Sequence, residues 1–184
     1  KVGTPEERAT ILNAQREILK RKPQLISKFE DYCKDKGYKY NASIGEIYDY
    51  CVLEYPFALW QWGTPVSTIP SADSSNDVWF AHFIKTSSPD YFSCPNQYLP
   101  FFVQAARELG YYGYSTKGLE DVCDLKTTKG YLNKLMLPKE LSNIKFDKSL
   151  YKRTVKFLKK NDPTHIFIYG EIDPWSAAAP FWLD

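Results

Sequence analysis

Hydrophobic positions at the start of the chain recur at helical spacing. Thr4, Pro5 and Glu7 form a helix-start signal, with a cap residue, a proline in the first position and a glutamate three residues after the cap. The apolar face that follows keeps its register beyond Pro23 and ends at Gly37. Because proline has no backbone N–H to donate, the pattern predicts either one kinked helix or two abutting helices.

A second capping signal, Ser43 with Glu46 three residues later, predicts a helix that Pro56 interrupts. The strongly apolar segment 57–62 is expected to be buried, and residues 64–76, rich in Ser, Pro and Thr, form a predicted loop. Periodic apolar positions predict four further helices, at 77–85, 97–109, 127–137 and 147–160. The last of these is expected to face inward through Leu150, Thr154, Phe157 and Leu158.

The period changes near the end of the chain. Asp162 and Pro163 break the last helix, and residues 165–169 form a continuous apolar run, as in a strand buried on both faces of a parallel sheet. A lone buried strand cannot satisfy its backbone groups, so its neighbours are expected in sequence that this chain lacks. The predicted fold class is mainly α, with residues 1–160 as a helical domain and 161–184 as a fragment of an α/β domain.

The chain ends agree with this interpretation. The sequence starts at Lys1 without an initiator methionine and stops on the apolar residues 181–184, whereas natural ends are usually polar. We therefore expect a piece of a longer protein. It contains no signal peptide.

Charge and composition narrow the function classes. Lys and Arg number 24 against 22 Asp and Glu, and this near-neutral balance argues against nucleic acid or an anionic membrane as partner. No apolar run approaches the ~20 residues that span a bilayer. Aromatic residues make up 16% of the chain. Most are expected in the core, and some are candidates to line a groove for an apolar ligand.

The four cysteines leave two alternatives open. Cys33, Cys51, Cys94 and Cys123 show no C-x-x-C spacing and no adjacent histidine, so no metal site is predicted. An even number is compatible with disulfides in an exported protein, and equally with buried thiols that act as small hydrophobic side chains.

One carboxylate stands where α/β enzymes place catalytic groups. Asp173 follows the predicted strand on the loop at its C-terminal end, and Pro174 holds it extended. In an α/β-hydrolase the triad acid accepts a hydrogen bond from the histidine and stabilises the imidazolium. The alternative is that Asp173 only caps the helix that follows.

The segment 169–177, Tyr-Gly-Glu-Ile-Asp-Pro-Trp-Ser-Ala, resembles the triad-acid segment of the secreted bacterial prolyl tri- and tetrapeptidyl aminopeptidases. These are α/β-hydrolase serine peptidases related to the lysosomal Pro-Xaa carboxypeptidases. The opening segment 3–8 is similar to the start of that family's helical lid. The resemblance implies a helical lid domain of an α/β-hydrolase, Asp173 as triad acid, and a serine exopeptidase that releases short, proline-containing peptides from peptide N-termini.

The resemblance also implies export to the periplasm or the extracellular space, short peptides as partners and no cofactor. The family's nucleophile and histidine lie outside this chain, so the chain alone should be inactive. Ser115 lies in a glycine-flanked turn without the strand that a nucleophile elbow needs. His82 and His165 are not placed to serve as the base.

Two neighbours of Asp173 are candidate substrate-binding residues. An aminopeptidase must recognise a free amine, and a buried ammonium needs an acidic partner, for which Glu171 is the candidate. Trp175 is a candidate apolar wall for proline, and the equal alternative is that it packs under the lid. The competing hypothesis is a non-catalytic helical module that binds a peptide or protein. The sequence assigns no oligomeric state.

Overall fold

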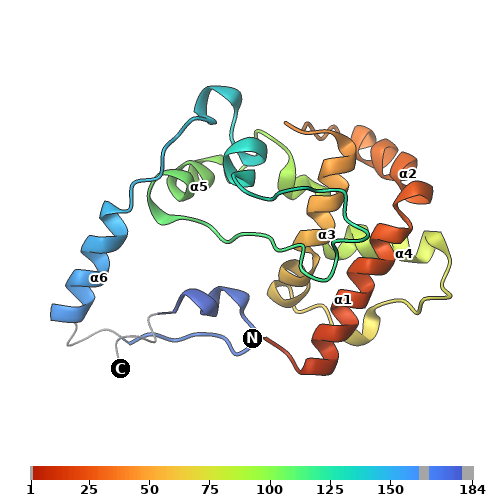
Figure 1. Ribbon diagram of the computed structural model, residues 1–184, viewed down its shortest axis with the longest axis horizontal. Coiled ribbons are helices and arrows are strands. Elements are labelled where there is room, and N and C mark those ends of the chain that lie inside the picture. The colour runs from red at the N-terminus through yellow and green to blue at the C-terminus, as the bar shows by residue number, and fades with distance from the viewer. Residues whose placement is uncertain (1, 162–165, 180–184) are drawn as a thin grey trace.

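The computed structural model describes residues 2–161 and 166–179. Helix α3 (Ile44–Gln61) lies at its centre, and α1 (Pro5–Lys20), α2 (Lys22–Asp35) and α4 (Asn76–Thr86) pack against it (Figure 1). Residues 47–55 of α3 are all buried, so this part of the helix is enclosed on all sides. The core of the molecule is therefore built around this one helix.

Both predicted capping boxes are present. The Thr4 hydroxyl accepts the Glu7 N–H at 3.2 Å, and the Glu7 carboxylate accepts the Thr4 N–H at 2.7 Å. Ser43 and Glu46 form the same arrangement at the start of α3. Between α1 and α2 the chain breaks at Arg21, so the proline-containing region forms two abutting helices.

The prediction that Pro56 interrupts its helix is wrong, because Pro56 lies inside α3. A proline at this position removes the N–H that would bond to the carbonyl of Val52. The Gln15 side chain of α1 supplies the missing donor, with 2.8 Å between its Nε2 and the Val52 oxygen. Burial of 57–62 is confirmed only in part, since Ala58 and Leu59 are buried and Trp62 is 77% exposed.

The second half of the chain is less regular. Helix α5 (Leu99–Gln104) continues as a π-helix, Ala105–Leu109, which ends at Gly110 with a φ of 76°. Within the predicted helix 127–137, only Leu132–Met136 is helical, again as a π-helix. Gly130, with a φ of 70°, is in the left-handed region and prevents an earlier start. Short 3-10 helices occupy Val66–Thr68, Pro89–Phe92, Lys139–Leu141 and Pro174–Ala178.

Helix α6 (Ser149–Asn161) forms as predicted but does not face inward. It has no buried residue, and Thr154 and Phe157 are exposed. Figure 1 shows α6 apart from the central helices, with the C-terminal segment returning below them towards the N-terminus. The amphipathic pattern correctly predicted a helix here. Among the described elements, α6 packs mainly against the π-helix Ala105–Leu109, so most of its apolar face stays uncovered.

The predicted strand at 165–169 is also absent from the described residues. His165 lies outside them, and residues 166–169 have no strand structure, with Ile166 86% and Ile168 88% exposed. A strand requires neighbouring strands for its N–H and C=O groups, and no β-strand is present among residues 2–161 and 166–179. All regular secondary structure in the described residues is therefore helical, and the predicted terminal strand is corrected to an exposed segment without strand structure.

All four cysteines are free thiols, and Cys33, Cys51 and Cys94 are buried as small hydrophobic side chains. Within the described ranges, no helix combines the length and the apolar character that crossing a membrane requires.

Candidate functional site

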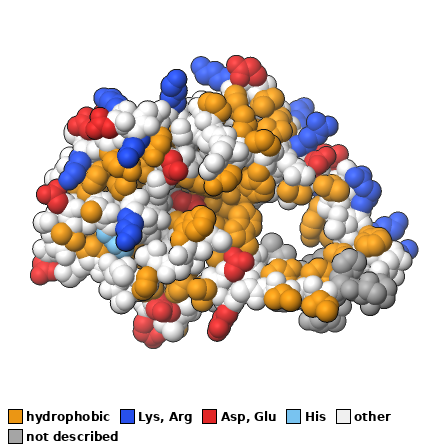
Figure 2. All heavy atoms as spheres, turned by 180° about the vertical axis from the view of Figure 1, so that it is seen from behind, with side chains coloured by type: hydrophobic (Ala, Val, Ile, Leu, Met, Phe, Trp, Pro, Cys, Tyr) orange, Lys and Arg blue, Asp and Glu red, His pale blue; other side chains and the backbone are white. Residues whose placement is uncertain are grey.

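A cavity of about 540 Å³ opens beside the C-terminal half of α3. Its walls come from α3, the end of α4 and the segment after it, α5, the segment 111–112, and the 3-10 helix near the C-terminus. Aromatic side chains dominate the lining: Phe57, Trp62, Tyr91, Tyr98, Phe101, Phe102, Tyr111, Tyr112 and Trp175. Figure 2 shows hydrophobic side chains gathered over the middle of one face of the molecule. The volume and lining suit a ligand of the size of a short peptide.

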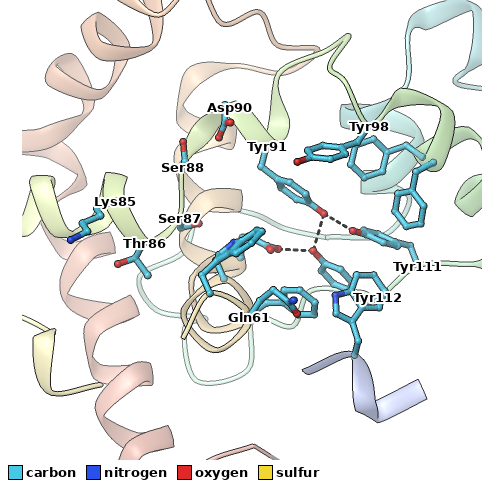
Figure 3. A pocket seen from close by; sticks show the side chains of 17 residues that line it. Gln61, Lys85, Thr86, Ser87, Ser88, Asp90, Tyr91, Tyr98, Tyr111 and Tyr112 are labelled. Atoms are coloured by element: carbon cyan, nitrogen blue, oxygen red, sulfur yellow. Dashed lines mark hydrogen bonds between the residues drawn. The ribbon is translucent and has the colours of Figure 1, made fainter. Parts of the chain in front are cut away.

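Three tyrosine hydroxyls meet in the cavity wall (Figure 3). The Tyr91 hydroxyl lies 2.7 Å from that of Tyr111 and 2.9 Å from that of Tyr112. Burial raises the pKa of all three phenols, so they stay neutral at ordinary pH. The result is a set of hydroxyl groups held in fixed positions on an otherwise apolar surface.

Glu54 of α3 extends this network into the core. The side chain is only 7% exposed, and its Oε2 accepts hydrogen bonds from Tyr112 at 2.9 Å and Tyr114 at 2.6 Å. Burial raises the pKa of the carboxyl to about 7, against the opposing effect of the two tyrosine bonds. A carboxylate with a pKa near neutrality in a cavity wall is a candidate functional group.

Trp175 joins the C-terminal segment to the cavity. Its ring lies edge-on to Phe57, with 5.4 Å between centroids, and 5.6 and 5.7 Å from the rings of Tyr111 and Tyr112. The side chain keeps 40% of its surface exposed. Trp175 is therefore part of the cavity wall, and its role in binding a substrate stays a prediction.

Asp173 occupies the cap position of the 3-10 helix Pro174–Ala178. Its Oδ1 accepts the Trp175 N–H at 2.9 Å, and the Ser176 hydroxyl donates to the Gly170 carbonyl at 3.0 Å across the same loop. The cap that was the alternative interpretation of Asp173 is thus present. Since a cap uses one carboxylate oxygen, this geometry is compatible with a second role for the other.

Glu171, the predicted amine-binding residue, is exposed and does not line the cavity. Ser115 is exposed, and its hydroxyl accepts the Lys117 N–H as a turn serine does. The His82 ring shares a hydrogen bond of 2.7 Å with the Tyr55 hydroxyl. In the described part of the chain, no group of three or more His, Cys, Asp and Glu side chains is placed to hold a metal ion.

Sequence reasoning missed Glu54 and the tyrosines around it. Two signals could have found them: an acidic residue inside the apolar run 51–59, and three tyrosines between 111 and 114. Their spatial relation was not available from spacing, because 58 residues separate Glu54 from Tyr112 along the chain.

Together these features describe a helical domain with an aromatic cavity of about 540 Å³. The family described as PS-10 peptidase S37 matches residues 1–183, and the chain belongs to this family of serine peptidases. It is also 22% identical over 191 residues to the prolyl tri/tetrapeptidyl aminopeptidase of Streptomyces mobaraensis. That alignment covers 99% of this chain and 39% of the relative. No solved structure matches.

The resemblance noted from the segment 169–177 is thereby confirmed at the level of the family.

Proposed function

We propose that this chain forms the helical lid and the acid-bearing segment of a serine exopeptidase that releases short, proline-containing peptides from peptide N-termini. The family match and the similarity to the prolyl tri/tetrapeptidyl aminopeptidase of Streptomyces support this proposal. In the complete protein, residues 1–160 would form the lid, and residues 161–184 would belong to the catalytic domain. Export is part of the same proposal.

The observation that carries the proposal is the position of Trp175. Its ring packs into the wall of the aromatic cavity, and Asp173 lies two residues earlier on a loop held by two hydrogen bonds. A substrate in the cavity would therefore lie beside the proposed triad acid. A cavity of about 540 Å³ also limits the substrate to short chains and excludes folded proteins.

As triad acid, Asp173 would accept a hydrogen bond from the catalytic histidine and stabilise the imidazolium that forms when the serine attacks. This role needs a carboxylate whose position is fixed before the substrate arrives. The bond from the Trp175 N–H to Oδ1 fixes it. We place the nucleophilic serine and the histidine outside this chain.

The substrate-binding roles follow from the same geometry. Trp175 provides an apolar face against which a proline ring can pack. Glu171 stays a prediction as the amine-binding residue, and its exposed position outside the cavity lining favours a different carboxylate.

The test is Asp173→Asn in the complete protein, assayed on the anilide of a proline-terminated tripeptide. Turnover should fall by roughly four orders of magnitude, because the amide stabilises the wrong histidine tautomer. Asp73→Asn, in an exposed loop, is the matched control and should keep full turnover. If Asp173→Asn also keeps near-full turnover, Asp173 is only a helix cap.

The second candidate is a non-catalytic peptide-binding module. Two observations favour it. The described residues form a cavity, and within them His82 bonds to Tyr55 and Ser115 to a backbone N–H, so neither belongs to a serine–histidine pair. The same assay separates the two candidates, since a binding module in the complete protein would bind the peptide without hydrolysing it.

A further inference from the structure

Glu54 is the enclosed acidic group of the aromatic cavity. The lining also contains an aspartate and a lysine, Asp90 and Lys85, and both are exposed. Figure 3 shows Lys85 well away from the hydroxyls of Tyr91 and Tyr112. Among the described residues, no ion pair to Glu54 is formed.

One oxygen of this carboxylate remains available. Both hydrogen bonds from tyrosine reach Oε2, and no group in the described ranges donates to Oε1. Oε1 is not sealed in the core either, since in the same ranges the only fully enclosed, unpartnered side-chain oxygen is Oδ2 of Asp49. Oε1 therefore has access to the cavity that Glu54 lines.

A buried carboxylate without a cation is costly, and the cost is removed when a cationic ligand binds. An ammonium group fits the surroundings of Glu54 in particular. It carries three N–H donors, which Oε1 and the oxygens of the Tyr91 and Tyr112 hydroxyls can accept. The faces of neighbouring aromatic rings, such as Tyr112, also attract a cation.

We propose that Glu54 binds the α-ammonium group of the peptide substrate, with Tyr112 and Tyr114 as positioning residues for its carboxylate. This inference rests on the proposed exopeptidase function, because it needs a substrate whose N-terminus is free. Peptides with a blocked N-terminus would leave the buried carboxylate unpaired, so they are rejected.

The experiment uses the complete protein and one tripeptide anilide in two forms, with a free and with an acetylated N-terminus. The wild-type kcat/KM should be roughly 10- to 100-fold higher for the free form, the range expected for one charge-assisted hydrogen bond. Glu54→Gln should bring this ratio close to one by raising KM for the free peptide. Glu140→Gln, an exposed glutamate outside the cavity, should leave the ratio unchanged.

Equal losses on both forms in Glu54→Gln would overturn the inference while leaving the peptidase function in place. Full turnover in Asp173→Asn would instead refute the proposed function. If Glu54→Gln fails to fold, the inference can be tested by measuring how strongly the free and the acetylated tripeptide inhibit the wild type. The inference predicts at least tenfold tighter inhibition by the free tripeptide, and equal inhibition overturns it.

Discussion

Glu54 and Asp49 show how one helix holds two acidic side chains in the core. Asp49 is 1% exposed and pairs with Lys22 across 2.7 Å, whereas among the described residues Glu54 accepts hydrogen bonds from tyrosine hydroxyls and pairs with no cation. From the sequence, both could be recognised as acidic residues within the apolar run of α3. Which of them has a cation could not be predicted, because Lys22 and the tyrosines come from segments distant in sequence.

The missing cation makes the stability of the protein depend on pH. The Glu54 pKa rises from its ordinary value of 4.5 to about 7 because of burial. Below pH 4.5 the carboxyl is protonated in both the folded and unfolded states, and its contribution to stability is complete. Between pH 4.5 and about 7 the carboxyl ionises in the unfolded state but stays protonated in the folded state. The free energy of unfolding therefore falls by about 3 kcal/mol over this range, and the loss levels off once the pH has risen through the folded pKa.

The measurement is the free energy of unfolding of wild type and Glu54→Gln in urea between pH 4.5 and 8.5. The stability of the wild type relative to the variant should decline over this range. Tyr112 and Tyr114 face Glu54, and because their pKa values are raised they remain neutral over this range. His82 titrates equally in both proteins, so its effect cancels in the difference. A difference independent of pH would contradict the buried, cation-free carboxylate.

At the scale of elements, local signals predicted the starts of the helices better than their course. The capping boxes at Thr4 and Ser43 involve residues three apart, so the sequence contains the whole interaction. The course of α3 through Pro56 depends on Gln15, which is 37 residues from Val52 along the chain. A long-range donor of this kind leaves no local pattern.

The hydrogen bond from Gln15 to the Val52 carbonyl can be tested by substitution. Gln15→Leu keeps an apolar side chain of similar size but leaves the Val52 carbonyl without a donor in the core. The free energy of unfolding should fall by about 1–3 kcal/mol. Gln24→Leu, on an exposed position of α2, should change it by less than about 0.5 kcal/mol. Equal effects of the two substitutions would show that α3 does not need this hydrogen bond.

For the whole molecule, the sequence predicted a helical body and an apolar C-terminal run, but the run does not form a strand. Phe157 of α6 is 51% exposed, and Ile166 and Ile168 are almost fully exposed. A helix face and an extended segment gain their final packing from partners, so their intrinsic patterns alone do not determine it. The family relative, of which this chain covers 39%, leads us to propose that a catalytic domain supplies those partners.

The central claim is that the Asp173 loop and the aromatic cavity form one peptidase site. A crystal structure of the complete protein with a bound tripeptide product tests it most directly. We expect a histidine nitrogen within hydrogen-bond distance of the Asp173 carboxylate, and the peptide between Trp175 and Glu54 with its amine on Glu54. A structure in which no imidazole reaches Asp173, and the peptide lies outside the cavity, would contradict it.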